Sequence, residues 1–297
     1  MHRALAAWLS ERPWAATMMA AAFAFLSPQG LSPFAVVAGA VPVLLALQRA
    51  PQAGVMAASV GSAAAFGTLL GGGVPLVVAV ASVLLVFAAP LGLGLMLKRT
   101  GSLNLCFQVG VLGIALALLV VHLVLEDPGA VWERWLELAV KSLADAGLEL
   151  DGTEVVASLR DNMWGSYAAL TLVTVLGALF LGRWWDTLVA SAGSFGREFR
   201  QLKLGLWLGL AMTVTVIVAV LADFALVDAL AWVAVTALAF EGLSAAHRGR
   251  AGGRFGQAWL VLIYVFLIVP PTAFIMVALL AGWGFMDNWR RTSWRVA

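Results

Sequence analysis

The sequence GRWWDTLVASAGSFGREFRQLKLG, residues 182–205, is a polar stretch between two segments that are hydrophobic enough to cross a bilayer. Aromatic and basic side chains are interleaved within it. Short basic stretches between long apolar segments are typical of helical membrane proteins. The stretch therefore predicts that the chain around it folds as a bundle of transmembrane helices.

The composition of the whole chain supports this fold class. Of the 297 residues, 62% are hydrophobic and only 11% are charged, whereas a soluble globular domain carries about 25% charged residues. The chain has too little polar surface to cover a water-facing domain, and it lacks the short alternating segments of a transmembrane barrel. We predict an all-α polytopic transmembrane bundle with about eight to ten hydrophobic segments, forming one membrane domain over residues 1–297.

The hydrophobic segments can be placed from the sequence. The first follows Arg3 and Arg12 and resembles a signal peptide, but it lacks a clear cleavage site, so we interpret it as an uncleaved first helix. The segments are predicted at residues 14–26, 31–47, 53–70, 74–97, 103–125, 164–181, 204–222, 226–246 and 258–285.

Lysine and arginine residues are concentrated in alternate loops, which predicts the orientation of the chain. If every segment up to residue 246 crosses the membrane once, the basic loops share one side, and the positive-inside rule makes that side the cytoplasm. We predict a multi-pass protein of the bacterial cytoplasmic (inner) membrane with a cytoplasmic N-terminus. The basic residues on this side are Arg3, Arg12, Arg49, Lys98, Arg99, Arg183, Arg197, Arg200, Lys203, Arg248, Arg250 and Arg254.

The last hydrophobic segment, residues 258–285, does not fit this pattern as a single crossing, because it would place the C-terminal arginines outside. Pro270 and Pro271 interrupt its middle. Two alternatives remain open. Two short helices turn back and return the C-terminus to the cytoplasm, or one kinked crossing leaves an outside tail; we favour the first.

An acidic stretch, residues 126–162, is predicted on the extracytoplasmic side. Asp127 can cap an amphipathic helix that Gly147 ends, and Asp151 and Glu154 can begin a second short helix. We expect the Trp-rich face of the first helix to rest at the membrane interface. A lid over a binding cavity is the alternative.

Few polar or ionisable residues lie at membrane depth, and these are the candidates for binding. His122, Asp223 and Asp228 lie near the outer ends of their segments and are the predicted ligand-binding residues, although headgroup hydrogen bonds or helix capping would also explain them. Asn104 and Gln108 lie four residues apart on one helix face and can reach the same partner. For these two amides, interhelical hydrogen bonding is favoured over ligand binding.

Two further groups of residues are predicted on the cytoplasmic side. Glu241, His247, Asp287 and Arg290 form a predicted polar cluster, in which pairing of Glu241 with Arg183 or Arg248 is the simpler explanation. Residues 182–204 are interpreted as an amphipathic connector that docks a protein partner or anionic membrane lipid. Its docking residues are Arg183, Trp184, Trp185, Phe195, Arg197, Glu198, Phe199, Arg200 and Lys203.

Several kinds of chemistry are excluded by residues that the sequence lacks. Cys106 is the only cysteine and lies in an apolar segment, so intramolecular disulfides and thiolate metal sites are excluded. Three histidines offer no metal cage, the glycines at 71–73 lack the lysine of a phosphate loop, and no basic domain would bind nucleic acid. We predict no cofactor, no metal, no nucleic-acid partner and no enzymatic activity.

The polar stretch also carries a family resemblance. Its runs Arg183-Trp184-Trp185, Gly193-Ser194-Phe195, Glu198-Phe199 and Leu202-Lys203-Leu204-Gly205 resemble the YybS-like family of uncharacterised bacterial membrane proteins. That family shows Arg-Trp-Trp, Pro-Gly-Gly-Phe, Glu-Phe and Leu-Arg-x-Gly. Here Ala192 replaces the proline and Lys203 the arginine. Further matches are Ser102, Leu103, Gln108, Gly242, Leu243, His247, Gly284, Asp287, Trp289 and Arg290.

The resemblance implies a distant similarity to the substrate-binding membrane subunits of energy-coupling-factor transporters. Those subunits are helical bundles that bind a small molecule and meet a partner subunit from the cytoplasmic side, and their binding residues do not map onto this sequence. We therefore expect a membrane protein that binds or transports a small molecule, without an ATPase of its own. The alternative is a structural or assembly factor that docks cytoplasmic partners or anionic lipid. An intramembrane enzyme is least favoured, because no acid/base constellation appears.

Overall fold

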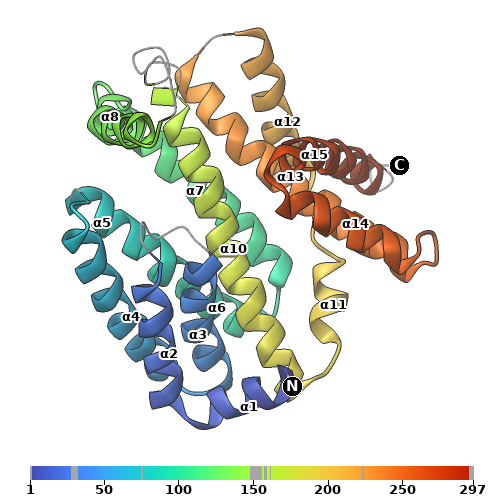
Figure 1. The fold of residues 1–297 in the computed structure, drawn as a ribbon. Helices are drawn as coiled ribbons and strands as arrows, with labels where there is room; N and C mark the ends of the chain where they lie inside the picture. The colour runs from blue at the N-terminus through green and yellow to red at the C-terminus, as the bar shows by residue number, and fades with distance from the viewer. Residues whose placement is uncertain are drawn as a thin grey trace. The chain divides into compact units, whose positions relative to one another are not determined.

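The computed structural model describes residues 2–27, 33–74, 76–147, 156, 159–160, 162–222 and 224–293. In this part of the chain the regular structure is helical, without a strand (Figure 1), which confirms the predicted all-α fold. Six helical runs among the described residues are long and apolar enough to cross a membrane, so the chain is a multi-pass membrane protein. They are Pro51–Gly71, Leu76–Thr100, Leu103–Val124, Met163–Ala190, Ala225–Ala251 and Pro270–Arg291.

The contacts within the chain divide it into two compact units. Unit 1 comprises Met1–Gly110 and Leu170–Lys203, and unit 2 comprises Val111–Ala169 and Leu204–Ala297. The helices α7 (Leu103–Val124) and α10 (Met163–Ala190) each contribute residues to both units. The grouping of all these helices into one membrane domain stays a prediction.

The helices of unit 1 begin and end where proline and glycine direct. Proline occupies the first turn of α2, α3 and α4, where its missing N–H group costs no hydrogen bond. Gly101, with a φ of 65°, ends α6 in the left-handed conformation. The helices are α1 (His2–Glu11), α2 (Pro13–Phe25), α3 (Pro33–Gln48), α4 (Pro51–Gly71), α5 (Leu76–Val83), the π-helix η1 (Leu84–Ala88), α6 (Ala89–Thr100) and α11 (Ser194–Phe199), with parts of α7 and α10.

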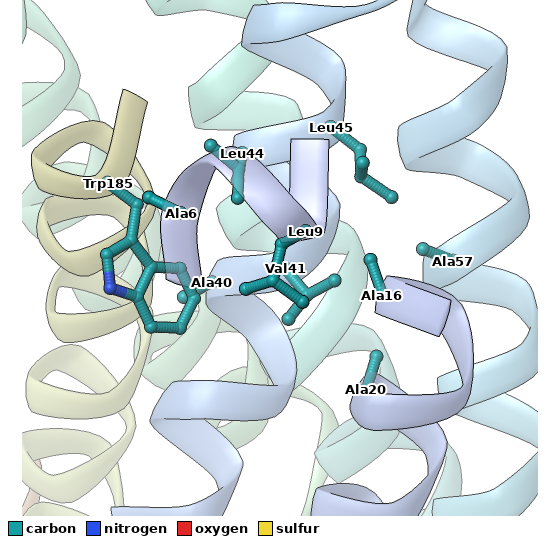
Figure 2. Close-up of a cluster of buried hydrophobic side chains, with 10 residues drawn as sticks. All are labelled: Ala6, Leu9, Ala16, Ala20, Ala40, Val41, Leu44, Leu45, Ala57 and Trp185. Carbon is teal, nitrogen blue, oxygen red and sulfur yellow. The ribbon is translucent and has the colours of Figure 1, made fainter. Parts of the chain in front are cut away.

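Small side chains let the helices of unit 1 approach one another closely. A Cβ atom on Gly39 would lie 2.5 Å from the carbonyl oxygen of Val86, and one on Gly182 would lie 2.8 Å from that of Ala40. Helix association inside a bilayer depends on such close packing, because lipid tails are as apolar as the side chains. Figure 2 shows the resulting core, in which the indole of Trp185 lies among alanine, valine and leucine side chains of α1 and α3.

The polar connector between α10 and the apolar helix α12 (Leu206–Leu221) is shorter than predicted. Helix α10 does not stop at Gly182 but continues to Ala190, and residues 191–193 form the turn before α11. Arg183 and Asp186 lie one turn apart in α10 and form an ion pair, so the helix carries these charges without interruption. The amphipathic connector is therefore confined to residues 191–205.

The basic ends of several helices in unit 1 lie at the same end of that unit. The ammonium group of Lys98 donates to the carbonyl oxygens of Ala46 and Arg49, at 2.7 and 2.6 Å. The guanidinium of Arg49 in turn donates to the carbonyl oxygen of Ser10 at 2.8 Å. These bonds agree with the predicted gathering of basic residues on one side, within unit 1. Their placement in the cytoplasm stays a prediction.

Unit 2 contains the C-terminal helices and a peripheral amphipathic helix. The close crossing of α13 and α15 is made by two glycines, since a Cβ atom on Gly242 would lie 1.9 Å from the carbonyl oxygen of Leu280, and one on Gly284 would lie 2.0 Å from that of Leu238. The helices are α8 (Ala130–Asp145), α12 (Leu206–Leu221), α13 (Ala225–Ala251), α14 (Gln257–Ile268) and α15 (Pro270–Ser293), with parts of α7 and α10.

The last hydrophobic segment forms two helices rather than one kinked helix. The chain is extended at Val269, and α15 begins at Pro270, where proline is compatible with a first helical turn. The rings of Phe255 and Trp283 lie 5.6 Å apart, so α15 runs back along α14. This is the turn-back alternative, although α15 is longer than a half-helix and continues to Ser293.

The acidic stretch contains the predicted amphipathic helix, α8, and Gly147 ends it with a φ of 88°; its extracytoplasmic placement stays a prediction. The carboxylate of Asp127 accepts the N–H of Ala130 at 3.2 Å. Trp132 is buried, with its ring 5.3 Å from that of Trp164. Helix α10 therefore covers the Trp132 side chain, and the placement of the Trp-rich face at the membrane interface stays a prediction. The second helix predicted from Asp151 and Glu154 lies outside the described residues.

Candidate functional site

The most unusual polar residue of the chain is Glu241, in the middle of α13. Its side chain is fully buried, with 0% of its surface exposed. One carboxylate oxygen, Oε2, accepts the N–H of Leu204 at 3.1 Å, and the other, Oε1, has no hydrogen-bond partner in the structure. An ionisable group inside a transmembrane helix is costly and is by default a candidate for function. We therefore built the site outward from this residue.

Asn288 on α15 binds the backbone next to Leu204. Its Oδ1 accepts the N–H of Gly205 at 3.1 Å, and its Nδ2 donates to the carbonyl oxygen of Gly205 at 3.0 Å. Gly205 has a φ of 82°, which favours glycine. Gly209 leaves room for the amide, since a Cβ atom there would lie 1.9 Å from Nδ2. The Gly205/Gly209 spacing thus serves close packing against a side chain.

Glu241 and Asn288 together fix the backbone just before α12. The N–H groups of Leu204 and Gly205, which precede the helix, find their acceptors on side chains of α13 and α15. A negative charge beside this helix start is also favourable, because the helix dipole is positive there. The arrangement has a structural task, yet that task uses only one of the two Glu241 oxygens.

A second layer of charge surrounds Glu241. Asp287 forms ion pairs with Arg248 and with Arg291, the latter at 3.5 Å. Arg248 also donates to the hydroxyl of Ser244 at 2.8 Å. Asp287, Arg291 and Arg248 are close enough to interact electrostatically with Glu241. The residues Glu241, Ser244, Arg248, Asp287, Asn288 and Arg291 are called the Glu241 cluster below.

The structure places two residues of the predicted polar cluster near each other and the other two elsewhere. Glu241 and Asp287 are brought together as expected. His247 is bonded elsewhere, with its Nε2 2.9 Å from the Tyr264 hydroxyl. Arg290 lines a shallow hollow with Phe285, Met286 and Trp289.

Three members of the cluster were missed. The i, i+4 spacing of Asp287 and Arg291 was a usable signal, whereas nothing in the sequence pointed to Ser244 or Asn288.

A second polar group lies in unit 1 and is centred on Arg183. Its guanidinium forms two bonds with the Glu198 carboxylate, from Nε at 3.0 Å and from Nη2 at 2.6 Å, and it pairs with Asp186. The amide of Gln48 donates to the carboxylate and to the backbone carbonyl of Asp186. These four residues, called the Arg183 network, join α3, α10 and α11. Arg183 and Glu198, predicted as docking residues, are therefore engaged within the protein.

Most other predicted docking residues also contact the protein itself. Trp185 and Phe199 are buried, which removes them from any docking surface. Phe195 and Phe199 lie against the ring of Phe180, with centroids 6.3 and 5.5 Å away.

Trp184 is half-buried, with its ring 5.6 Å from that of His2. Arg200 and Lys203 are also half-buried. Arg197 is exposed, so it is the residue of this group that best suits an external contact.

The two amides on α7 bind a common partner, as their spacing predicts. Asn104 Oδ1 accepts the backbone N–H of Lys203 at 2.7 Å, and Gln108 Nε2 donates to the carbonyl oxygen of the same residue at 3.0 Å. The partner is an irregular backbone segment after α11 rather than another helix. These bonds favour the structural interpretation of both amides over ligand binding.

Of the three predicted ligand-binding residues, the structure describes His122 and Asp228. His122 Nδ1 lies 3.0 Å from the carbonyl oxygen of Leu118 in its own helix. Asp228 is half-buried in the first turn of α13, where a carboxylate complements the helix dipole. Asp223 lies outside the described residues. A shared ligand site for these three side chains stays a prediction.

Comparisons with known proteins add no assignment. No family model, no curated protein and no solved structure matches the chain. The resemblance to the YybS-like family therefore stays a prediction. Among the described residues, no group of three or more histidine, cysteine, aspartate or glutamate side chains could hold a metal ion.

Proposed function

We propose that the protein binds a small solute in the membrane and takes part in its transport, with Glu241 as the central binding residue. The proposal rests on one observation: a fully buried carboxylate on a candidate membrane span has an oxygen without a hydrogen-bond partner. A buried polar atom left without a partner costs about 1–3 kcal/mol, and more if it is charged. A ligand that donates a hydrogen bond to Oε1 would offset that cost.

The surroundings of Glu241 indicate what kind of solute fits. An ionised carboxylate only accepts hydrogen bonds, so the solute must supply a donor, either a hydroxyl, an amide or an amine. Both arginines of the Glu241 cluster already pair with Asp287. The sequence shows no phosphate-binding loop, which fits a protein that depends on a partner or on an ion gradient for energy.

The proposal can be tested by thermal unfolding of the purified protein in a screen of small metabolites. We expect a bound solute to raise the unfolding temperature; at a concentration of 100 times its Kd, the expected stabilisation is about 2.7 kcal/mol. The Glu241→Gln variant should lose most of this effect. Glu137→Gln, the same change on the exposed face of α8, should keep it. A solute that stabilises Glu241→Gln as much as the wild type would contradict the proposed site.

A second candidate function, docking of a cytoplasmic partner or anionic lipid, is favoured by the setting of Arg197. The bonds between Arg183 and Glu198 fix α11, and the packing of Phe199 on Phe180 fixes it further, while Arg197 remains exposed. Each basic side chain near an anionic membrane contributes about 1 kcal/mol of attraction. Replacing Arg197 and Arg200 by alanine should leave folding intact and reduce the recovery of a crosslinked partner or of co-purified anionic lipid. Unchanged recovery of both would contradict docking.

A further inference from the structure

We propose that Glu241 is a proton-binding site, and that its proton controls how firmly the start of α12 is held. The inference rests on the proposed function of the same site, because proton and solute would compete for the same oxygen. It names the second ligand of the site by chemical class: a hydrogen ion taken up at Oε1.

The two carboxylate oxygens of Glu241 differ in their hydrogen bonding. Oε2 accepts the Leu204 N–H, whereas Oε1 has no partner. A proton on Oε1 converts this oxygen from an acceptor into a hydroxyl donor and leaves Oε2 able to accept as before. The geometry therefore accommodates a carboxylic acid without moving Leu204.

Charged side chains face Glu241 from its own helix and from α15. Arg248 lies on α13 itself, and Asp287 and Arg291 lie on α15. Helix α12 has no titratable side chain, and on α14 the hydroxyl of Tyr264 pairs with His247. With Glu241 ionised, the four charges of the cluster sum to zero. With Glu241 protonated, the cluster carries a net charge of +1, which an incoming anion or a headgroup phosphate can neutralise.

Protonation of Glu241 also affects its hydrogen bond with the Leu204 backbone. In the ionised state, the bond from Leu204 to Oε2 is charge-assisted, and such bonds are about twice as strong as neutral ones. The carboxylate also interacts favourably with the positive end of the α12 dipole. Protonation removes both contributions. Asn288 still holds Gly205 through two bonds. The expected change is therefore a local loosening at Leu204, while Gly205 stays bound.

The site would then work as an exchange site. A proton on Oε1 turns this oxygen into a donor and makes it a weaker acceptor for the solute, so the release of one favours the uptake of the other. The loosening at Leu204 would accompany the protonated state alone. The fold thereby connects occupancy of Glu241 to the segment that begins a transmembrane helix.

Infrared difference spectroscopy and hydrogen exchange test the proton site without any solute. Full-length protein in nanodiscs would be titrated between about pH 5 and pH 9, around the reference range of perturbed carboxyls. We expect a buried protonated-carboxyl band that grows at acid pH and is absent from Glu241→Gln. Amide exchange of the peptide that contains Leu204 and Gly205, relative to a reference peptide in α8, should rise about fivefold on acidification of the wild type. In Glu241→Gln, the ratio of exchange between this peptide and the reference peptide should not change with pH.

The controls separate this inference from the proposed function. Glu137→Gln should retain both the band and the change in exchange. If Glu241→Gln does not fold, Glu241→Asp keeps a carboxyl and should shift the band. A band that persists in Glu241→Gln, or an exchange ratio that does not depend on pH in the wild type, would overturn the inference. Titration without any stabilising solute would leave the proton site standing and contradict solute binding; solute binding without titration would do the reverse.

Discussion

The Arg183 network and the Glu241 cluster differ in how completely their carboxylates are paired. Each uses a carboxylate to hold two parts of the chain together: Glu198 joins α11 to α10 in unit 1, and Glu241 on α13 holds Leu204 just before α12 in unit 2. In the network, each carboxylate is paired with Arg183, whose side chain is 21% exposed. In the cluster, Glu241 is 0% exposed and keeps one oxygen without a partner. Complete pairing indicates a structural role, and incomplete pairing at greater burial indicates where a ligand is expected.

The largest expected effect comes from closing the helix crossing that supports the Glu241 cluster. In Gly284→Ala, the new Cβ atom would lie 2.0 Å from the Leu238 carbonyl oxygen, so α13 and α15 must separate. Forcing atoms into a packed contact costs about 1–3 kcal/mol, and more against backbone. Thermal unfolding in detergent would measure the loss. Gly282→Ala, with open space around it on the same helix, is the control and should not destabilise; equal stability of both variants would refute the crossing.

The next effect should come from breaking the completed network. Arg183→Met leaves Asp186 and Glu198 without their cation, and removal of one partner from a largely buried pair costs about 3 kcal/mol. The double variant Arg183→Met/Glu198→Leu should recover part of this loss, as measured by a double-mutant cycle. Glu241→Gln should cost less than Arg183→Met, because an amide oxygen can still accept the Leu204 N–H. The reverse order would break the distinction between the two regions.

A smaller effect is expected at the amides that hold Lys203 in unit 1. Asn104→Leu leaves the backbone N–H of Lys203 without its acceptor, at a cost of about 1–2 kcal/mol. The loss in Gln108→Leu should be similar, and the double variant should lose less than the sum because both side chains bind one residue. Unfolding by denaturant would show this, with the exposed Leu105→Ala on the same helix as a control. Simple additivity would indicate that the two bonds act separately.

The smallest effect is a pH dependence near the start of α8 in unit 2. The hydrogen bond from Arg160 lowers the pKa of Asp127 below its usual value. A carboxyl with a lowered folded pKa contributes stability that is present above about pH 4 and is lost as the pH falls further. Hydrogen exchange of α8 peptides should therefore accelerate, relative to α13 peptides, on acidification below that pH. In Asp127→Asn this relative acceleration should disappear; if it remained, another carboxyl would be responsible.

Local features of the sequence predicted a large part of this fold. Prolines at helix starts, and glycines such as Gly101 and Gly147 at helix ends, set boundaries close to the predicted ones. The four-residue spacing of Asn104 and Gln108 predicted a common partner, because two amides on one helix face reach the same place. These successes share a cause: the information lies within one or two helical turns.

The parts that could not be predicted depend on pairs of residues far apart in the chain. Glu198 binds Arg183 from a separate helix, and Asn288 binds Gly205 across 83 positions. No spacing rule relates such residues. The continuation of α10 to Ala190 has a similar cause. Charged residues such as Arg183 and Asp186 are typical of a loop between membrane helices, and their partners within the protein do not show in the sequence.

The length of α12 has a consequence for the lipid around the protein. Its 16 residues span about 24 Å, less than the hydrocarbon thickness of about 30 Å. If α12 crosses the membrane, one of its ends lies within the acyl-chain region or the bilayer thins there, and peptide groups at that depth have no water to bind. Glu241 and Asn288 supply the missing partners for Leu204 and Gly205. Acyl-chain length thus becomes a variable that acts on this carboxylate, and thicker bilayers should increase the dependence of the fold on it.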